Sequence, residues 1–306
     1  MDTIFFFAWE AELILLIQSL MGPAGILLMS FFTMFGEETV ITVILGFLYW
    51  GWNKELGERL AVNLFSVSTV CPLIKNFFYM LRPYFVIKEV KCLKPVENGD
   101  IYDVLTQGYS FPSAHTASAA ATYGTLAVYS RKRIIKTVLY LLIAAVGVSR
   151  FSLGVHYPTD VIAGAVLGLI FVCVSSMIDV LQYRKAYFYI LIALCSPGLL
   201  FCSTEDYFTC FGLMCGGLTG MLYEREHVRF RSTNRIGVII VRIVCGIAVF
   251  VSIVNLLKIA ETGLSGSVSE KVVLYWRSIR YAAAAFVTIG LYPYFFRSID
   301  RMFKEN

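Results

Sequence analysis

Long apolar runs alternate with short polar loops along most of the chain. About nine of these runs approach the roughly 20 apolar residues that a helix needs to cross the hydrocarbon core of a bilayer. They lie at approximately 24–51, 57–81, 113–130, 134–152, 159–181, 186–202, 207–223, 235–257 and 272–296. Because backbone polar groups in lipid must be satisfied within their own segment, we expect every run to be helical. The predicted fold class is all-α, a polytopic membrane helical bundle of about nine transmembrane helices.

The first twenty residues follow a different pattern. Glu10, Glu12 and Gln18 interrupt an otherwise apolar stretch, which is typical of an amphipathic helix that lies in the headgroup plane. We expect no cleavable signal peptide, because the stretch has no basic start and contains acidic residues. The pattern therefore predicts an N-terminal interfacial helix ahead of the spans.

Composition supports a membrane protein. Hydrophobic residues make up 58% of the chain and charged residues 15%, whereas soluble domains contain about 25% charged residues. This excludes an ordinary soluble fold and indicates membrane lipids, and no nucleic acid, as partners.

The basic residues between the runs predict the orientation. They gather in four places: Arg131 to Lys136, Arg184 with Lys185, Arg225 to Arg235, and Arg297 to Lys304. By the positive-inside rule these segments face the cytoplasm, and so does the C-terminus. Lys88, Lys91 and Lys94, in the long loop after Pro83, depart from the rule. We interpret these three lysines as cations that serve an anionic substrate.

Several polar residues, together with Ala114, stand at the ends of the apolar runs that this topology places on the extracytoplasmic face. They are Lys75 and Arg82 after the second run, Ser113, Ala114 and His115 at the start of the third, Arg150 at the end of the fourth, and His156 and Asp160 before or at the start of the fifth. Chance rarely places separated polar clusters at one depth on one side of a membrane. The pattern therefore predicts a single site.

These residue types suit phosphate transfer. Lys75, Arg82 and Arg150 can surround the non-bridging oxygens of a phosphate, and the helix start at Ser113 offers free N–H groups to an anion. His156, with Asp160 nearby, has the pattern of a nucleophile that a carboxylate holds in one tautomer. His115 is then free to protonate a leaving oxygen. Such a site needs neither a metal nor another cofactor, because cations and N–H groups stabilise the transition state.

Three motifs, Lys75-x6-Arg82-Pro83, Pro112-Ser113-Ala114-His115 and Ser149-Arg150-x5-His156-x3-Asp160, resemble the signature of the type 2 phosphatidic acid phosphatase family, the membrane lipid phosphate phosphatases. The resemblance implies a covalent phospho-histidine mechanism. His156 would attack phosphorus, Asp160 would orient it, and His115 would act as general acid. Lys75, Arg82, Ser113, Ala114 and Arg150 would bind phosphate. The sequence departs from the family pattern at Ala114, where glycine is commonest.

The resemblance covers residues 1–181, which we predict to be the lipid phosphatase catalytic core. Residues 182–306 hold four further runs of unknown role, with Gly216, Gly217 and Gly220 suggesting close helix packing. The role of this second region is open: it could select the substrate, form a surface for a partner or form a homo-oligomer.

The sequence leaves the substrate open among polyprenyl diphosphate, phosphatidic acid and similar lipid phosphates. Gly36-Glu37-Glu38 and the long outer loop resemble the sphingosine-phosphate phosphatase branch, so a sphingoid-base phosphate is an alternative. Glu37 and Glu38 are ionisable groups near lipid. One of them could therefore have a functional role, or could instead pair with another polar group. A non-catalytic lipid-phosphate binder or transporter is disfavoured, because binding alone requires neither His115 nor His156. A vanadate-dependent peroxidase shares this pocket type but is soluble.

Overall fold

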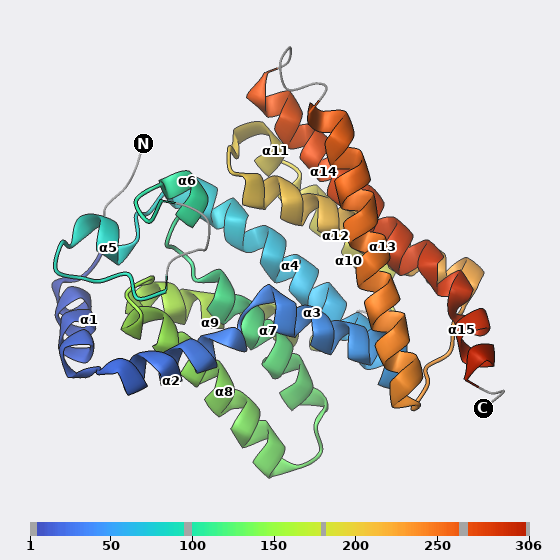
Figure 1. The fold of residues 1–306 in the computed structure, drawn as a ribbon, viewed down its shortest axis with the longest axis horizontal. Helices are drawn as coiled ribbons and strands as arrows, with labels where there is room; N and C mark the ends of the chain where they lie inside the picture. The colour runs from blue at the N-terminus through green and yellow to red at the C-terminus, as the bar shows by residue number, and fades with distance from the viewer. Residues whose placement is uncertain (1–4, 95–99, 179–181, 263–268, 304–306) are drawn as a thin grey trace. The chain divides into compact units, whose positions relative to one another are not determined.

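The computed structural model describes residues 5–94, 100–178, 182–262 and 269–303, and every regular secondary-structure element in these ranges is a helix (Figure 1). No extended strand occurs in these ranges, so the predicted all-α class is confirmed. The elements are α1 (Ala8–Leu20), α2 (Pro23–Met34), α3 (Glu38–Phe47), η1 (Leu48–Trp52), α4 (Lys54–Phe78), α5 (Pro83–Val86), α6 (Val104–Gln107), α7 (Ala114–Tyr129), α8 (Arg133–Ser152), α9 (Pro158–Met177), α10 (Arg184–Cys195), α11 (Gly198–Phe201), α12 (Glu205–Tyr223), η2 (Glu224–Val228), α13 (Ile236–Thr262), α14 (Glu270–Phe286), η3 (Val287–Leu291), η4 (Tyr292–Phe295) and α15 (Phe296–Met302).

Six helical stretches in the described residues are long and apolar enough to cross a membrane. They are Lys54–Phe78, Arg133–Ser152, Pro158–Met177, Arg184–Phe201, Ile236–Ile259 and Glu270–Met302. The number rises to seven if α2 and the following helix to Trp52, which are bent by 40° at their junction, form one broken span. The expected count of nine is therefore not confirmed. Of the missing spans, α7 has only 16 residues, and α12 begins with two acidic residues and is rich in glycine.

Helix α1 lies at the position expected for the N-terminal helix, but its place in a headgroup plane stays a prediction. Two of the residues that interrupt its apolar pattern make contacts inside the protein. The buried carboxylate of Glu10 accepts hydrogen bonds from the amide and the hydroxyl of Thr159, at 2.8 and 2.7 Å. Gln18 donates to the carbonyl of Lys91 at 2.8 Å and accepts from its amide at 3.0 Å. These polar residues therefore attach α1 to segments that are distant in the sequence.

The chain forms two compact units, Met1–Ile41 with Val70–Ser176 and Thr42–Thr69 with Met177–Asn306. The second unit thus contains a segment from the N-terminal third of the chain. The boundary at residue 181 between a catalytic core and a second region was drawn from the motifs. It concerns function rather than packing, and it stays a prediction.

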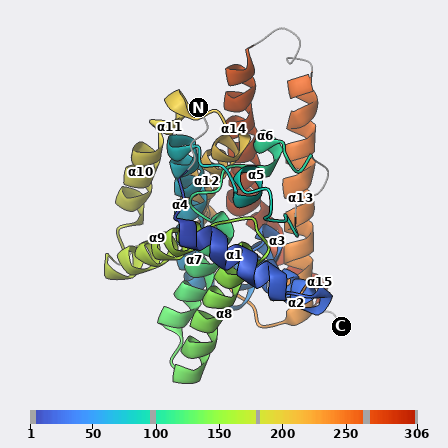
Figure 2. The same ribbon diagram turned by 90° about the vertical axis from the view of Figure 1, so that its left-hand side faces the viewer.

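In the first unit, α7, α8 and α9 pack together (green in Figure 1 and Figure 2). Gly164 and Gly168 of α9 lie against the backbone of α7, and a Cβ added at Gly168 would stand 2.5 Å from the carbonyl oxygen of Ala117. A larger residue at either glycine would push the two helices apart. This close approach fixes the start of α7 beside the start of α9.

In the second unit, α12 packs against α14 (Figure 2). Gly212, Gly216 and Gly220 bring α12 close to the backbone of α14 and η3. The close helix packing predicted around Gly216 and Gly220 is confirmed, and it follows the small-xxx-small pattern of membrane helices.

Candidate active site

All eight predicted site residues belong to the first unit and stand at or beside the ends of its helices. Lys75 lies in the last turn of α4, Arg82 caps α5, Ser113 caps α7, and Arg150 lies in the last turn of α8. Ala114 and His115 open α7, Asp160 is in the first turn of α9, and His156 lies in the loop between α8 and α9. The predicted site residues therefore stand at helix ends, as the motif spacing predicts.

His156 is buried, and one of its nitrogens faces a carboxylate. Its Nδ1 atom is 3.4 Å from Oδ2 of Asp160 and 3.4 Å from the hydroxyl oxygen of Ser110. Ser110 donates to the same Asp160 oxygen at 2.5 Å, and the amide of Tyr157 donates to it at 2.8 Å. Because Nδ1 faces this polar group, Nε2 is the nitrogen left for attack on a substrate. Sequence reasoning missed Ser110, which precedes the Pro112-Ser113-Ala114-His115 motif by only two residues.

The charge state of His156 follows from its burial and from the cations around it. Burial lowers the pKa of His156 well below its usual value, and the charges of Arg82, Arg150 and Lys75 lower this pKa further. The imidazole is therefore neutral at pH 7, the form in which it can act as a nucleophile. The three predicted cations, which are far apart in the sequence, thus all act on this one side chain.

Arg150 and Arg82 are held in place by hydrogen bonds to the protein. Arg150 is buried, and its guanidinium donates to the hydroxyl of Thr33 at 2.7 Å. Its Nε is buried without a hydrogen-bond partner among the described residues. Because a buried polar group without a partner is costly, this guanidinium favours an anionic ligand. Arg82 donates to the carbonyl oxygen of Gly108 at 2.9 Å and to that of Gln107. Thr33 is a second residue that sequence reasoning missed.

The start of α7 supplies backbone N–H groups, with one correction to the expected set. The amide of Ser113 donates to the backbone carbonyl of Asp160 at 3.0 Å, so it is occupied. Its hydroxyl lies 3.1 Å from that of Thr116. The amides of Ala114 and His115 are in the first turn of the helix, where N–H groups lack an acceptor within the helix. These two amides therefore fit the expected role better than that of Ser113.

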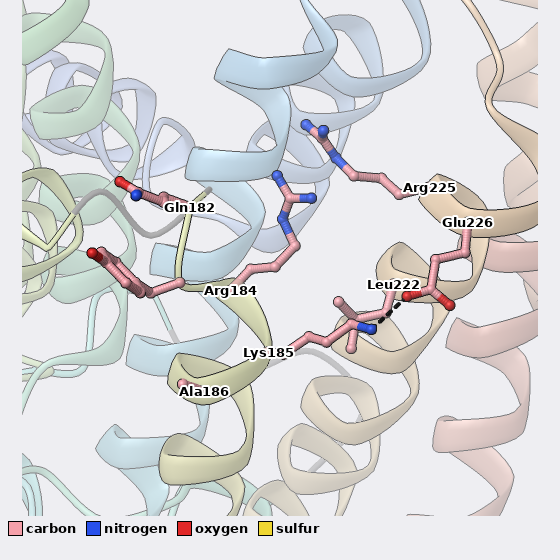
Figure 3. A pocket seen from close by; sticks show the side chains of 8 residues that line it. Gln182, Arg184, Lys185, Ala186, Leu222, Arg225 and Glu226 are labelled. Carbon is pink, nitrogen blue, oxygen red and sulfur yellow. Dashed lines mark ion pairs between the residues drawn. The ribbon is translucent and has the colours of Figure 1, made fainter.

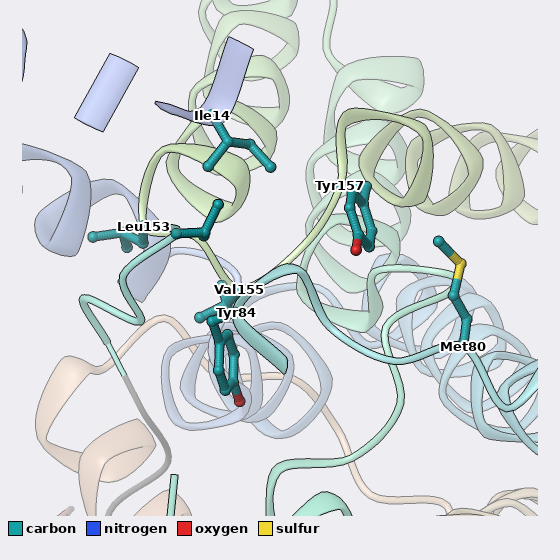
Figure 4. Packing of buried hydrophobic residues seen from close by; sticks show 7 residues of the cluster. Ile14, Met80, Tyr84, Leu153, Val155 and Tyr157 are labelled. Atoms are coloured by element: carbon teal, nitrogen blue, oxygen red, sulfur yellow. The ribbon is translucent and has the colours of Figure 1, made fainter. Parts of the chain in front are cut away.

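A cluster of buried apolar side chains supports the loops that carry Arg82 and His156 (Figure 4). Its members come from α1, from the segment around α5 and from the loop between α8 and α9, and they are Ile14, Met80, Tyr84, Val90, Leu153, Val155 and Tyr157. Because packed side chains resist displacement, this cluster holds both loops in position.

The bend between α2 and α3 also borders the site. A Cβ added at Gly36 would lie 3.2 Å from the Cβ of His115, and the hydroxyl of Tyr123 donates to the carbonyl of Phe35 at 2.8 Å. Glu37 forms an ion pair with Lys94, at 2.5 Å. Of the two roles considered for Glu37, the structure shows the pairing role.

A separate pocket in the second unit is lined by charged residues from α10 and η2, together with neighbouring uncharged residues (Figure 3). Acidic side chains already neutralise its cations. Arg225 binds Glu58 through two nitrogens, at 2.8 and 2.7 Å, and Lys185 pairs with Glu226 at 2.6 Å. None of the eight predicted site residues lines this pocket. In the parts of the chain that the structure describes, no group of three His, Cys, Asp or Glu side chains is placed to hold a metal ion.

Residues 58–183, which include all eight predicted site residues, match the sequence model of the PAP2 superfamily. The chain belongs to the PAP2 superfamily. Residues 208–302 match a second model, the transmembrane extension of PAP2 superfamily phosphatases. The family predicted from the three motifs is therefore confirmed, and the region that those motifs left unexplained has a family match of its own.

Three curated relatives are phosphatases. The chain is 35% identical over 71 residues to phosphatidylglycerophosphatase B of Bacillus subtilis, which covers 20% of this chain and 35% of that protein. It is 30% identical to an undecaprenyl-diphosphatase of Sulfolobus acidocaldarius, over 46% of this chain and 64% of the relative. It is 26% identical to a lipid A 4'-phosphatase of Bacteroides thetaiotaomicron, over 52% of this chain and 72% of the relative. The chain thus spans less than two thirds of the length of the first two of these relatives.

Proposed function

We propose that this protein is an integral-membrane phosphatase that hydrolyses a lipid phosphate monoester or diphosphate through a phospho-histidine intermediate. The observation that carries the proposal is the buried His156, with Ser110 and Asp160 at Nδ1 and the charges of Arg82, Arg150 and Lys75 acting on it. The family match and the phosphatase relatives support the reaction class.

In the first step, Nε2 of His156 forms a bond to phosphorus, and the bond from phosphorus to the leaving oxygen breaks. His115 gives its proton to that oxygen, and Asp160 stabilises the charge on His156. Lys75, Arg82 and Arg150, with the amides of Ala114 and His115, bind the non-bridging oxygens. The hydroxyl of Ser113 is the part of that residue left for phosphate.

In the second step, His115 accepts a proton from water, and the resulting oxygen attacks phosphorus. The bond from Nε2 to phosphorus breaks, inorganic phosphate leaves, and both histidines return to their starting states. This sequence uses the positive charge of three side chains where other phosphatases use a metal. No further cofactor takes part.

The proposal extends to orientation and partners. From the basic loops we expect the active site on the extracytoplasmic face and the C-terminus in the cytoplasm. Membrane lipids surround the helices, the substrate is a lipid phosphate, and nucleic acid is not a partner. A sphingoid-base phosphate is the alternative substrate. Assembly into a homo-oligomer is an open question.

The test is phosphate release by purified protein from a panel of polyprenyl diphosphate, phosphatidic acid and sphingoid-base phosphate. His156→Ala should abolish release, whereas His227→Ala is the matched control, because His227 is exposed in η2 of the second unit. Normal release by His156→Ala would contradict the proposed nucleophile. Binding of lipid phosphate without release by the unaltered protein would instead favour the binder or transporter.

A further inference from the structure

An ion pair between Lys94 and Glu37 lies at the edge of the active site. The Nζ atom of Lys94 is 2.5 Å from Oε1 of Glu37, and each side chain is about one third exposed, at 33% and 32%. The pair joins the loop after α5 to the bend between α2 and α3. Lys94 therefore differs from Lys75, Arg82 and Arg150, which are buried.

The ion pair is on the side of the site where His115 lies. Glu37 follows Gly36, which packs directly against His115. The charge of Lys94 acts on His115, and the charge of Glu37 acts on Arg150. In the proposed reaction His115 protonates the leaving oxygen, so Lys94 lies on the side of the site from which the leaving group departs.

The charge of the leaving group depends on the substrate. A lipid phosphate monoester releases a neutral alcohol, to which a nearby cation contributes little. A lipid diphosphate releases a lipid monophosphate, whose negative charge a nearby ammonium group stabilises. A cation in this position is thus useful mainly for a diphosphate.

We propose that Lys94 binds the second phosphate of a lipid diphosphate, and that this phosphate replaces Glu37 as the partner of Lys94. The inference rests on the proposed function and names its substrate class. Nε2 of His156 bonds to the terminal phosphorus, and the bond from this phosphorus to the bridging oxygen breaks. The bridging oxygen keeps the electron pair and takes the proton of His115. Water then releases phosphate from His156, so diphosphate and water give lipid monophosphate and inorganic phosphate.

The experiment compares kcat/KM for a polyprenyl diphosphate with kcat/KM for the corresponding monophosphate. Lys94→Ala should lower the ratio of the two about tenfold, which is about 1.4 kcal/mol. Lys94→Arg should retain most of the ratio because it keeps the charge. Lys132→Ala, which removes an exposed lysine from the loop between α7 and α8, is the control and should leave the ratio unchanged.

Glu37→Gln separates this role from a purely structural one. A structural ion pair is broken equally by either substitution, so both variants would change the ratio in the same direction. Our proposal predicts opposite effects, because Glu37→Gln removes the carboxylate that competes with the second phosphate. Competitive inhibition by methylenediphosphonate should likewise weaken in Lys94→Ala and strengthen in Glu37→Gln, relative to inhibition by methylphosphonate.

An unchanged ratio in Lys94→Ala, or a change of the same sign in both variants, would overturn the inference and leave the proposed phosphatase intact. Failure of the folded, unaltered protein to release phosphate from either lipid would contradict the proposed function itself, and the inference with it.

Discussion

Replacing Ser110 by alanine tests the geometry around His156, because the Ser110 hydroxyl lies next to both His156 and Asp160. It donates to Oδ2 of Asp160 at 2.5 Å and is 3.4 Å from Nδ1 of His156. The other oxygen of Asp160, Oδ1, is buried and has no hydrogen-bond partner in the described ranges. The substitution therefore leaves Oδ2 facing only the amide of Tyr157 and Nδ1 of His156 among the contacts that the structure shows.

A hydrogen bond to a charged group contributes about 1.5–3 kcal/mol. If this contribution is expressed in the transition state, kcat/KM should fall roughly 10-fold to 150-fold. The assay is phosphate release by purified Ser110→Ala, with its thermal unfolding measured alongside. Ser175→Ala is the matched control, because Ser175 is a buried serine of α9 whose hydroxyl donates within its own helix, to the carbonyl of Val172. Activity of Ser110→Ala equal to that of the control would refute the argument.

Three further predictions concern pH, metals and topology. Because burial and the neighbouring cations lower the pKa of His156, kcat/KM should stay high below about pH 6.5, the usual pKa of histidine. Lys75→Met removes one of these cations, so the fall of kcat/KM at low pH should move to higher pH. If that fall stays where it is, His156 is not the group that titrates. Excess chelator should leave phosphate release unchanged, since Lys75, Arg82 and Arg150 supply the positive charge, and loss of activity that magnesium restores would show a metal requirement. In intact cells, an impermeant thiol reagent should label Lys88→Cys and not Lys132→Cys in a cysteine-depleted background, and the reverse pattern would invert the topology.

The sequence allowed the helical class to be predicted, and it placed the candidate site residues at helix ends, because Lys75, Arg82 and Arg150 stand where apolar runs end. Their roles in a reaction stay a prediction. The sequence did not show Ser110 or Thr33, since hydroxyl residues are common near helix ends and Thr33 meets Arg150 only through the packing of α2 on α8. The predicted count of nine membrane spans is not confirmed, because apolar runs in the sequence do not show helix length: α7 has only 16 residues and falls short of a full span.

The sequence also did not predict the contacts of charged residues in the N-terminal third of the chain. The sequence pattern places Glu10 on the polar face of an amphipathic helix. In the structure its carboxylate is buried against Thr159, 149 positions away. Glu37 forms an ion pair with Lys94, which is 57 positions away in the sequence. Such pairs depend on how distant helices pack, which hydrophobic periodicity does not specify.

The central claim is that His156 carries the phosphoryl group during turnover. Rapid quenching with substrate labelled with ³²P at the terminal phosphate tests it most directly. We expect a labelled protein whose phosphate is stable to alkali and labile to acid, with the label on the peptide that contains His156 and absent from His156→Ala. Turnover of the unaltered protein with no labelled intermediate under rapid quenching, or label on a different residue, would contradict the account.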